Sequence, residues 1–166
     1  MPEIPELEAI CKVLNREVAA VPIQRATVRI PIIIRTPPKD EFVAILTGNA
    51  FKKFERRGKF VLGELQSGHT LAVHLMLTGR LQLCASGDKL QPRTCWVVSF
   101  QNGTDLRYFG ERMDGRVYLV RTEGLESIPG LKGIGPDALY GGLTFAEFMQ
   151  RIKRYTGQIK NVITNE

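Results

Sequence analysis

The sequence has few of the residues that usually bind metal ions or form disulfide frameworks. It contains three cysteines, Cys11, Cys84 and Cys95, and two histidines, His69 and His74. The cysteines are odd in number and include no C-x-x-C pair, and with these histidines they match no zinc-binding spacing. We therefore expect buried, reduced thiols, and we expect neither a metal ion nor another cofactor in this chain.

A long hydrophobic run and a secretory leader are also missing. No stretch approaches the length of a membrane span, and the first ten residues, MPEIPELEAI, are charged where a signal peptide is apolar. At 166 residues and 43% hydrophobic, the chain fits one domain whose core needs no disulfide or metal for stability. These features predict a soluble, cytoplasmic protein with no membrane partner, which we expect to be a monomer.

Basic residues outnumber acidic residues. The formal net charge is +6 at pH 7 and the pI is about 9.4, which favours a polyanionic partner such as nucleic acid. Two stretches concentrate this charge: FKKFERRGKF at residues 51–60, where Glu55 is the only acid, and QRIKRYTGQIK at residues 150–160. Each stretch suits a solvated surface as well as a track that binds phosphates, and the sequence leaves both interpretations open.

Apolar residues near the N-terminus follow the period of a helix. They recur three and four positions apart, at Ile4, Leu7, Ile10, Leu14 and Val18. This spacing places them on one face of a helix that begins almost at the first residue. We therefore predict a helix whose apolar face anchors the N-terminus to the core.

From about Val28 to Val120 the pattern changes to short runs rich in Val, Ile, Phe and Leu. Turn signals separate these runs, namely PP at 37–38, SG at 67–68, SG at 86–87 and NG at 102–103. This pattern is typical of several antiparallel strands. The strongest hairpin signal is CWVVSF followed by QNGT and DLRYFG, because Asn-Gly readily adopts the positive φ angles of a tight turn.

A helical pattern returns near the C-terminus, in TFAEFMQRIKRY. Thr144 and Glu147 form a capping box, and the predicted buried stripe consists of Phe145, Phe148, Met149 and Ile152. The fold class we predict is α+β and mainly β: an antiparallel β-sandwich or pseudo-barrel flanked by an N-terminal and a C-terminal helix. The ending GQIKNVITNE has no stop signal and is typical of the first turns of another helix, so we expect a cut chain.

The prolines at the N-terminus permit a specific chemistry. Removal of Met1 exposes the secondary amine of Pro2, whose attack on an aldehyde yields an iminium ion that has no N–H proton to lose. This permanent cation draws electrons and promotes elimination at the adjacent carbon, while a positioned carboxylate or ammonium moves the protons. The same residues also suit a plain helix start, with Pro2 and Pro5 in the first turn and Glu3 and Glu6 complementing the helix dipole.

Five separated stretches resemble the motifs of one protein family: MPEIPELE, RRGKFVLGEL, HLMLTGRL, DLRYFG and GPDAL. They stand in the same order and at similar spacings as in the formamidopyrimidine-DNA glycosylase and endonuclease VIII family of base-excision-repair enzymes. The resemblance covers essentially the whole chain. It implies an N-terminal catalytic domain over residues 1–155, followed at residues 156–166 by the start of a truncated or absent helix–two-turn–helix module.

The resemblance implies a bifunctional enzyme and its catalytic residues. The implied activity is that of a DNA glycosylase and abasic-site lyase, which removes oxidised bases from damaged double-stranded DNA through a Schiff base on the N-terminal proline. Pro2 would be the nucleophile that attacks the sugar C1′, and Glu3 the acid or base for sugar opening and proton transfer. Glu6 would give electrostatic support, and Lys59 would contact the phosphates around the lesion and steady the surroundings of the nucleophile.

The resemblance also implies four DNA-binding residues. His74 would help to bind the DNA backbone, and three side chains would fill the gap left by the flipped nucleotide. Phe109 would wedge between bases, Arg107 would pair with the orphaned base and Leu77 would occupy the vacated stack. Taken singly, Leu77 and Phe109 suit core positions equally well, Lys59 suits a surface charge and His74 an ordinary polar position.

The chain departs from the family pattern in several places. Met76 and Leu77 stand where Gly-Met is usual, so we expect crowding at position 76 to reshape the loop, and Tyr108 stands where a basic residue is common. The sequence ends at Glu166, before the rest of the helix–two-turn–helix module and the four-cysteine zinc finger that family members commonly carry. We therefore expect weaker DNA binding from this chain alone, because phosphate contacts supply most of the affinity for duplex DNA.

Two other functions stay open at this stage. The same fold without chemistry would give a non-catalytic DNA- or protein-binding module, which is in keeping with the missing module. Small tautomerases also use an N-terminal proline, as a base, but their chain runs from the proline directly into a strand. Here the residues after Pro2 have a helical period, so a helix that begins beside Pro2 would exclude the tautomerase.

Overall fold

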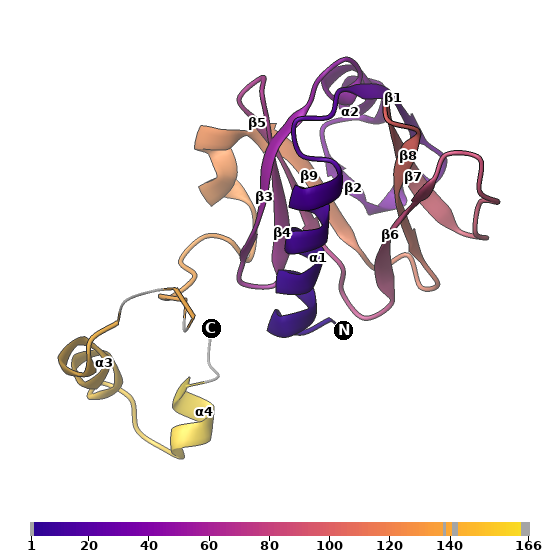
Figure 1. The fold of residues 1–166 in the computed structure, drawn as a ribbon. Helices are drawn as coiled ribbons and strands as arrows, with labels where there is room; N and C mark the ends of the chain where they lie inside the picture. Colours follow the sequence, from indigo (N-terminus) through magenta and orange to yellow (C-terminus); the bar gives the residue numbers. More distant parts are fainter. Residues whose placement is uncertain (1, 138, 141–142, 164–166) are drawn as a thin grey trace.

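The computed structural model describes residues 2–137, 139–140 and 143–163, and two β-sheets form the body of the fold (Figure 1). One sheet has four strands in the order β1 (Ile23–Val28), β7 (Thr94–Phe100), β8 (Thr104–Gly110) and β6 (Gly79–Ala85). The other sheet has five strands in the order β2 (Ile34–Thr36), β9 (Arg116–Arg121), β5 (His69–His74), β4 (Phe60–Leu65) and β3 (Phe51–Arg57). Paired strands run antiparallel except β2 and β9, which are parallel.

Four α-helices accompany the sheets in the described part of the chain. α1 (Ile4–Glu17) packs along β3, and α2 (Lys39–Leu46) packs on β1. α3 (Phe145–Ile152) and α4 (Ile159–Ile163) follow the sandwich and lie apart from it (Figure 1). None of the described helices is long and apolar enough to cross a membrane.

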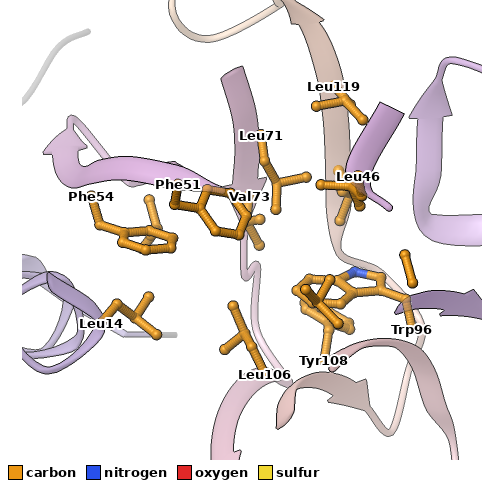
Figure 2. Close-up of a cluster of buried hydrophobic side chains, with 14 of the residues drawn as sticks. Leu14, Leu46, Phe51, Phe54, Leu71, Val73, Trp96, Leu106, Tyr108 and Leu119 are labelled. Carbon is orange, nitrogen blue, oxygen red and sulfur yellow. The ribbon is translucent and has the colours of Figure 1, made fainter. Parts of the chain in front are cut away.

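The core lies between the inner faces of the two sheets (Figure 2). Phe51 and Leu71 of the five-stranded sheet are buried in one cluster with Trp96 and Leu106 of the four-stranded sheet, and α1 adds Leu14. Side chains alternate between the faces of a strand, so every second residue of these strands reaches the core. The predicted fold class, a mainly β sandwich with helices at both ends of the chain, is confirmed.

The hairpin predicted from the Asn-Gly signal is formed by β7 and β8. The two strands pair from Ser99 and Asp105 to Thr94 and Phe109, and Gly103 in the connecting turn has a φ of +80°. A positive φ is the conformation that glycine adopts without strain, which explains why this dipeptide marks the turn.

α1 begins where its apolar period predicts, but its buried face is shifted. Leu7, Leu14 and Val18 are buried as expected, and Cys11 joins them. Ile4 remains 36% exposed, because the first turn of α1 extends past the ends of the strands (Figure 1). Burial raises the pKa of the Cys11 thiol to about 12, so this thiol is protonated at neutral pH.

Two features of the strand region have no clear signal in the sequence. α2 buries Phe42 and Leu46, but it lies in a stretch whose aromatic and β-branched residues also suit a strand. β2 pairs with β9 through Ile34 and Val117, which are far apart in the chain, and no local pattern encodes that contact. The expectation of antiparallel strands alone is therefore corrected at both places.

α3 has the predicted capping box but lacks the predicted buried stripe. The Thr144 hydroxyl accepts a hydrogen bond from the Glu147 N–H at 3.3 Å, and the Glu147 carboxylate accepts one from the Thr144 N–H at 2.9 Å. Phe145, however, is 77% exposed, and no described residue of α3 is fully buried. A helical period reveals an apolar face but does not supply the surface that would cover it.

Strand pairing brings several loops to one end of the sandwich. His74, at the end of β5, pairs with Phe60 at the start of β4 and with Arg116 at the start of β9. On the other sheet, Gly79 at the start of β6 pairs with Gly110 at the end of β8. The β3–β4 turn, the β5–β6 loop and the β8–β9 loop therefore share this end, where Figure 1 also shows the N-terminus.

Candidate active site

Pro2 directly precedes Glu3, the N-cap residue of α1, and the start of that helix is held in a defined conformation. Glu3 is the N-cap residue with an extended backbone, and Pro5 lies in the first turn. The Glu6 carboxylate accepts a hydrogen bond from the Glu3 N–H at 3.0 Å, which fixes the backbone next to Pro2. Pro2 is half-buried and both glutamates are exposed. Because Pro2 borders a helix and not a strand, the tautomerase interpretation is excluded.

A buried arginine joins α1 to the β3–β4 turn. Arg56 Nε donates to Glu8 on α1 at 2.7 Å, and its Nη2 donates to Asp137 at 2.5 Å. Nη1 donates to the carbonyl of Gly58, next to Lys59, at 3.1 Å. Burial opposes ionisation of Asp137, but hydrogen bonds from a backbone N–H and from Arg56 hold the pKa of this carboxyl below its ordinary value. The helix that carries Pro2, the turn that carries Lys59 and the segment around Asp137 are thus held together.

Lys59 and His74 line one cavity of about 300 Å³. Lys59 is half-buried in a turn that Gly58 permits through its φ of +57°. His74 Nδ1 accepts a hydrogen bond from the Met76 N–H at 3.1 Å, so a neutral ring carries its proton on Nε2. The Phe60 ring packs edge-on against His74, with ring centroids 4.9 Å apart. The structure therefore brings two of the predicted phosphate-binding residues to one place.

Leu77 stands on the β5–β6 loop and is 55% exposed. The Asp114 carboxylate, on the β8–β9 loop, accepts hydrogen bonds from the Leu77 N–H at 3.3 Å and from the Thr78 hydroxyl at 3.1 Å. Thr78 Oγ1 in turn accepts from the Arg112 N–H at 3.1 Å. Met76 has a φ of +53°, the left-handed conformation that suits glycine better than methionine. The two loops thus form one hydrogen-bonded unit that presents an apolar side chain to solvent.

We expect Asp114→Ala to loosen the Leu77 loop. The substitution removes the acceptor of two hydrogen bonds, which at this half-buried position stabilise the fold by about 1–2 kcal/mol. Asp114→Asn keeps one acceptor oxygen and should cost less. Urea unfolding measures the loss of stability, and amide hydrogen exchange at Leu77 measures the local loosening. Unchanged exchange at Leu77 in Asp114→Ala would contradict the role assigned to this carboxylate.

Arg107 is buried and hydrogen-bonded within the protein, whereas the base-pairing role predicted for it requires a side chain that reaches DNA. This residue is 1% exposed, and its guanidinium donates to the Asp105 carboxylate at 2.8 Å from Nη2 and 3.1 Å from Nε. Its other hydrogen bonds go to backbone carbonyls at the end of β6 and just after it, those of Ala85, Ser86, Asp88 and Lys89. The alternation of β8 turns Arg107 to the outer face of the sheet, where this loop covers it. Arg107 therefore holds a loop in place and does not reach solvent.

Phe109 lies near the end of β8, half-buried, on the face that also carries Arg107. It pairs with Arg80 on β6 and Thr94 on β7, and the next residue, Gly110, pairs with Gly79 at the end of the Leu77 loop. The wedge role of Phe109 stays a prediction.

Tyr108 is a core residue, which explains why no basic residue stands there. It is fully buried and its ring stacks on Trp96 with centroids 6.0 Å apart. Burial raises the pKa of its hydroxyl. The hydroxyl lies against Gly79 and Gly115, where an added Cβ would collide with it. The two glycines and Tyr108 therefore fit together beneath the ends of both loops.

A functional candidate absent from the predicted set is Arg112. It is exposed, and its backbone is bonded to Thr78 in the loop of Leu77. The signal for it is the stretch FGERMDG, in which Gly110 and Gly115 enclose a short polar loop between two strands. Arg112 lies on a loop, from which its side chain can reach a ligand, whereas Arg107 of the DLRYFG stretch lies within β8.

Comparisons with known proteins agree with this geometry. The sequence profile of the formamidopyrimidine-DNA glycosylase N-terminal domain matches residues 1–117. The chain is 33% identical over 166 residues to a formamidopyrimidine-DNA glycosylase of Pelotomaculum thermopropionicum, and 37% identical over 139 residues to one of Moorella thermoacetica. These alignments cover 100% and 84% of this chain but only 60% and 51% of the relatives.

Solved structures share the fold. The formamidopyrimidine-DNA glycosylase of Lactococcus lactis, crystallised with DNA that contains an abasic site, superposes with a TM-score of 0.86 at 23% identity. That alignment covers 98% of this chain and 62% of the other. A complex of the L. lactis protein with DNA that contains a formamidopyrimidine lesion also gives a TM-score of 0.86, over 97% of this chain and 60% of the other.

Proposed function

This chain belongs to the formamidopyrimidine-DNA glycosylase family, and from that premise we propose that it is the catalytic part of a base-excision-repair glycosylase and abasic-site lyase. The chain spans 60% of the length of the first curated relatives, so its substrate, damaged double-stranded DNA, is part of the proposal. We assign residues 1–155 to the catalytic domain and residues 156–166 to the start of a further module. The observation that supports the proposal best is Pro2 at the start of a capped helix, at the same end of the sandwich as Lys59 and Leu77.

The proposed chemistry uses the secondary amine of Pro2 after removal of Met1. The amine attacks C1′ of the damaged nucleotide, the new C–N bond replaces the bond to the base, and the base leaves with the electron pair and takes up a proton. Protonation of the ring oxygen by Glu3 opens the sugar and leaves an iminium ion at C1′. Loss of a proton from C2′ then expels the 3′ phosphate. Each step moves protons near the exposed Glu3 carboxyl, whose backbone Glu6 holds in place.

Electrostatics at the helix start act on this amine in both directions. The unpaired N–H groups and the macrodipole at the N-terminus of α1 disfavour an ammonium ion, which keeps the amine nucleophilic. Glu3 and Glu6 favour the ammonium ion, because an opposite charge nearby stabilises it. Lys59, on the turn that Arg56 ties to α1, adds a positive charge that again favours the neutral amine and also attracts the phosphates of the substrate.

We assign DNA contacts to the loops at this end of the sandwich. Lys59 and His74 would bind backbone phosphates, and the exposed Leu77 would enter the base stack at the flipped nucleotide. Arg112 replaces Arg107 as the arginine for the orphaned base, because it is exposed and its backbone is bonded to the loop of Leu77. The hydrogen bond from the Arg112 N–H to Thr78 therefore positions the side chains of Arg112 and Leu77 as one unit.

Borohydride trapping tests the proposal. Reduction of the iminium ion converts it to a stable amine, so we expect a covalent adduct between this chain, once Met1 is removed, and a duplex with one abasic site. Intact mass of the protein first verifies the removal of Met1, and the mass of the adduct then identifies the linkage. Binding that depends on salt but yields no adduct would instead support the non-catalytic DNA-binding module.

A further inference from the structure

Three basic side chains from separate parts of the chain line the cavity of about 300 Å³ described above. Lys59 comes from the β3–β4 turn, His74 from the end of β5 and Arg116 from the start of β9. Residue 60 pairs with His74, and His74 pairs with Arg116, so the three lie in a row across the end of the five-stranded sheet. Neighbouring strands are about 5 Å apart, so the row has the scale of adjacent phosphates along a DNA strand.

The rest of the cavity wall leaves room for a polyanion. It consists, among the described residues, of backbone and apolar groups with no carboxylate: Gly58, Phe60, Pro129, Gly130, Ile134 and Gly135. Glycines allow a ligand backbone to approach closely because no side chain stands in its way. Among the described residues, this wall therefore places no carboxylate beside the Arg116 guanidinium.

Four basic residues of the stretch 51–60 form ion pairs within the protein. Lys52 pairs with Glu64 at 3.0 Å and Lys53 with Glu55 at 2.6 Å. Arg57 pairs with Glu126 at 2.5 Å, and Arg56 is shared between Glu8 and Asp137. The basic stretch 51–60 is therefore mostly a set of internal ion pairs, as in the solvated-surface interpretation. These four residues therefore offer less positive charge to a ligand than the composition of the stretch suggests.

We propose that Arg116 is a further DNA-binding residue, which contacts a backbone phosphate next to those bound by Lys59 and His74. This inference rests on the proposed function. The Arg116 guanidinium is exposed at the rim and offers the planar pair of donors that matches two phosphate oxygens. His74 Nδ1 accepts a hydrogen bond from the Met76 N–H, so the proton of a neutral ring is on Nε2. The site therefore combines three different phosphate donors in one row.

Matched substitutions at the two ends of β9 test this assignment. Arg116→Gln removes the charge at the cavity, whereas Arg121→Gln removes the same charge from an exposed arginine at the other end of the strand. The affinity of this chain for a duplex with a tetrahydrofuran abasic-site analogue is measured by fluorescence anisotropy between 50 and 200 mM salt, values chosen to span about the range over which phosphate contacts weaken. As a control, thermal unfolding of both variants measures whether they are folded.

A plot of log affinity against log salt concentration has a negative slope. For Arg116→Gln we expect the magnitude of this slope to decrease by about one and the affinity at low salt to drop by about tenfold. Arg121→Gln should leave both quantities unchanged. Arg116→Lys should keep the slope but lose affinity, because an ammonium lacks the paired donors of a guanidinium. The undamaged duplex should show the same change in slope, since a phosphate contact does not read the lesion.

Two results would overturn the assignment. Equal losses in Arg116→Gln and Arg121→Gln would mean that only net charge matters, and an unchanged slope in Arg116→Gln would mean that this residue contacts no phosphate. Failure of the unsubstituted chain to bind any duplex is a separate result. It would refute the proposed function itself, and the role of Arg116 with it.

Discussion

Adding one residue before Pro2 is expected to abolish the covalent adduct with abasic-site DNA. The added peptide bond turns the secondary amine into an amide, whose lone pair is delocalised and cannot attack C1′. The rate of adduct formation should fall by a factor on the order of 10³ or more, as when the nucleophile of other enzymes is removed. Retained Met1 has the same effect, so the measurement compares borohydride-trapped adduct in processed and extended protein by intact mass.

The controls for this prediction separate the nucleophile from its surroundings. Pro2→Gly keeps an N-terminal amine and should retain part of the adduct, whereas Glu3→Gln keeps the amine and should slow the proton transfers. DNA affinity should be similar in all these variants, because the extension alters no phosphate contact. An adduct of undiminished yield from the extended protein would show that an amine other than that of Pro2, either the α-amine of the added residue or the amine of a lysine such as Lys59, can act as the nucleophile.

Arg107→Met is expected to destabilise the protein by about 3–5 kcal/mol at pH 7. The substitution leaves the Asp105 carboxylate, which is 4% exposed, without its guanidinium partner. It also removes the donors for the backbone carbonyls that follow β6. Urea unfolding measures the cost. Asp105→Asn combined with Arg107→Met removes the unpaired charge and should recover part of the loss, but not the part due to the carbonyls.

The effect of Arg107→Met should depend on pH in a defined direction. In the unsubstituted protein burial opposes ionisation of Asp105, but hydrogen bonds from Ser86 and Ser99 and then Arg107 hold its pKa below the ordinary value. The pair therefore stabilises the fold above about pH 4, and this contribution is lost as the pH falls through the lowered pKa. Without Arg107 the pKa of Asp105 should rise, because one of the groups that oppose the effect of burial is gone, so the cost of Arg107→Met should become smaller on acidification. A difference in stability that stays constant from pH 7 to pH 4 would refute this coupling.

Some parts of the site follow from local pattern. The helical period after Pro2 predicts α1, and the Asn-Gly turn predicts the β7–β8 hairpin, because both depend on residues a few positions apart. Glu3 and Glu6 are expected to complement the helix dipole, and in the structure Glu6 also accepts a hydrogen bond from the Glu3 N–H. Lys59 and His74 were assigned through family motifs, and they line one cavity because β4 and β5 are paired neighbours.

Other parts depend on contacts that no local pattern encodes. The motif DLRYFG suggests an exposed arginine, but the register of β8 decides which face each residue takes, and Asp105 shares the outer face with Arg107. Arg56 joins Glu8 and Asp137, which lie 48 and 81 positions away from it in the chain. The loop of Arg112 contains no family motif that indicates a role for this residue, although the glycines around it mark a turn.

The fit of Tyr108 against Gly115 limits how this sequence can vary. The three nearest atoms to a Cβ at position 115 all belong to the Tyr108 side chain. A single substitution of Gly115 is therefore blocked, and a single reduction of Tyr108 leaves a cavity that costs about 3–5 kcal/mol. Natural drift can enlarge residue 115 only after residue 108 has become smaller, so the two positions should change in a fixed order during evolution. Ancestral reconstructions would then contain the small residue at 108 before the larger one at 115.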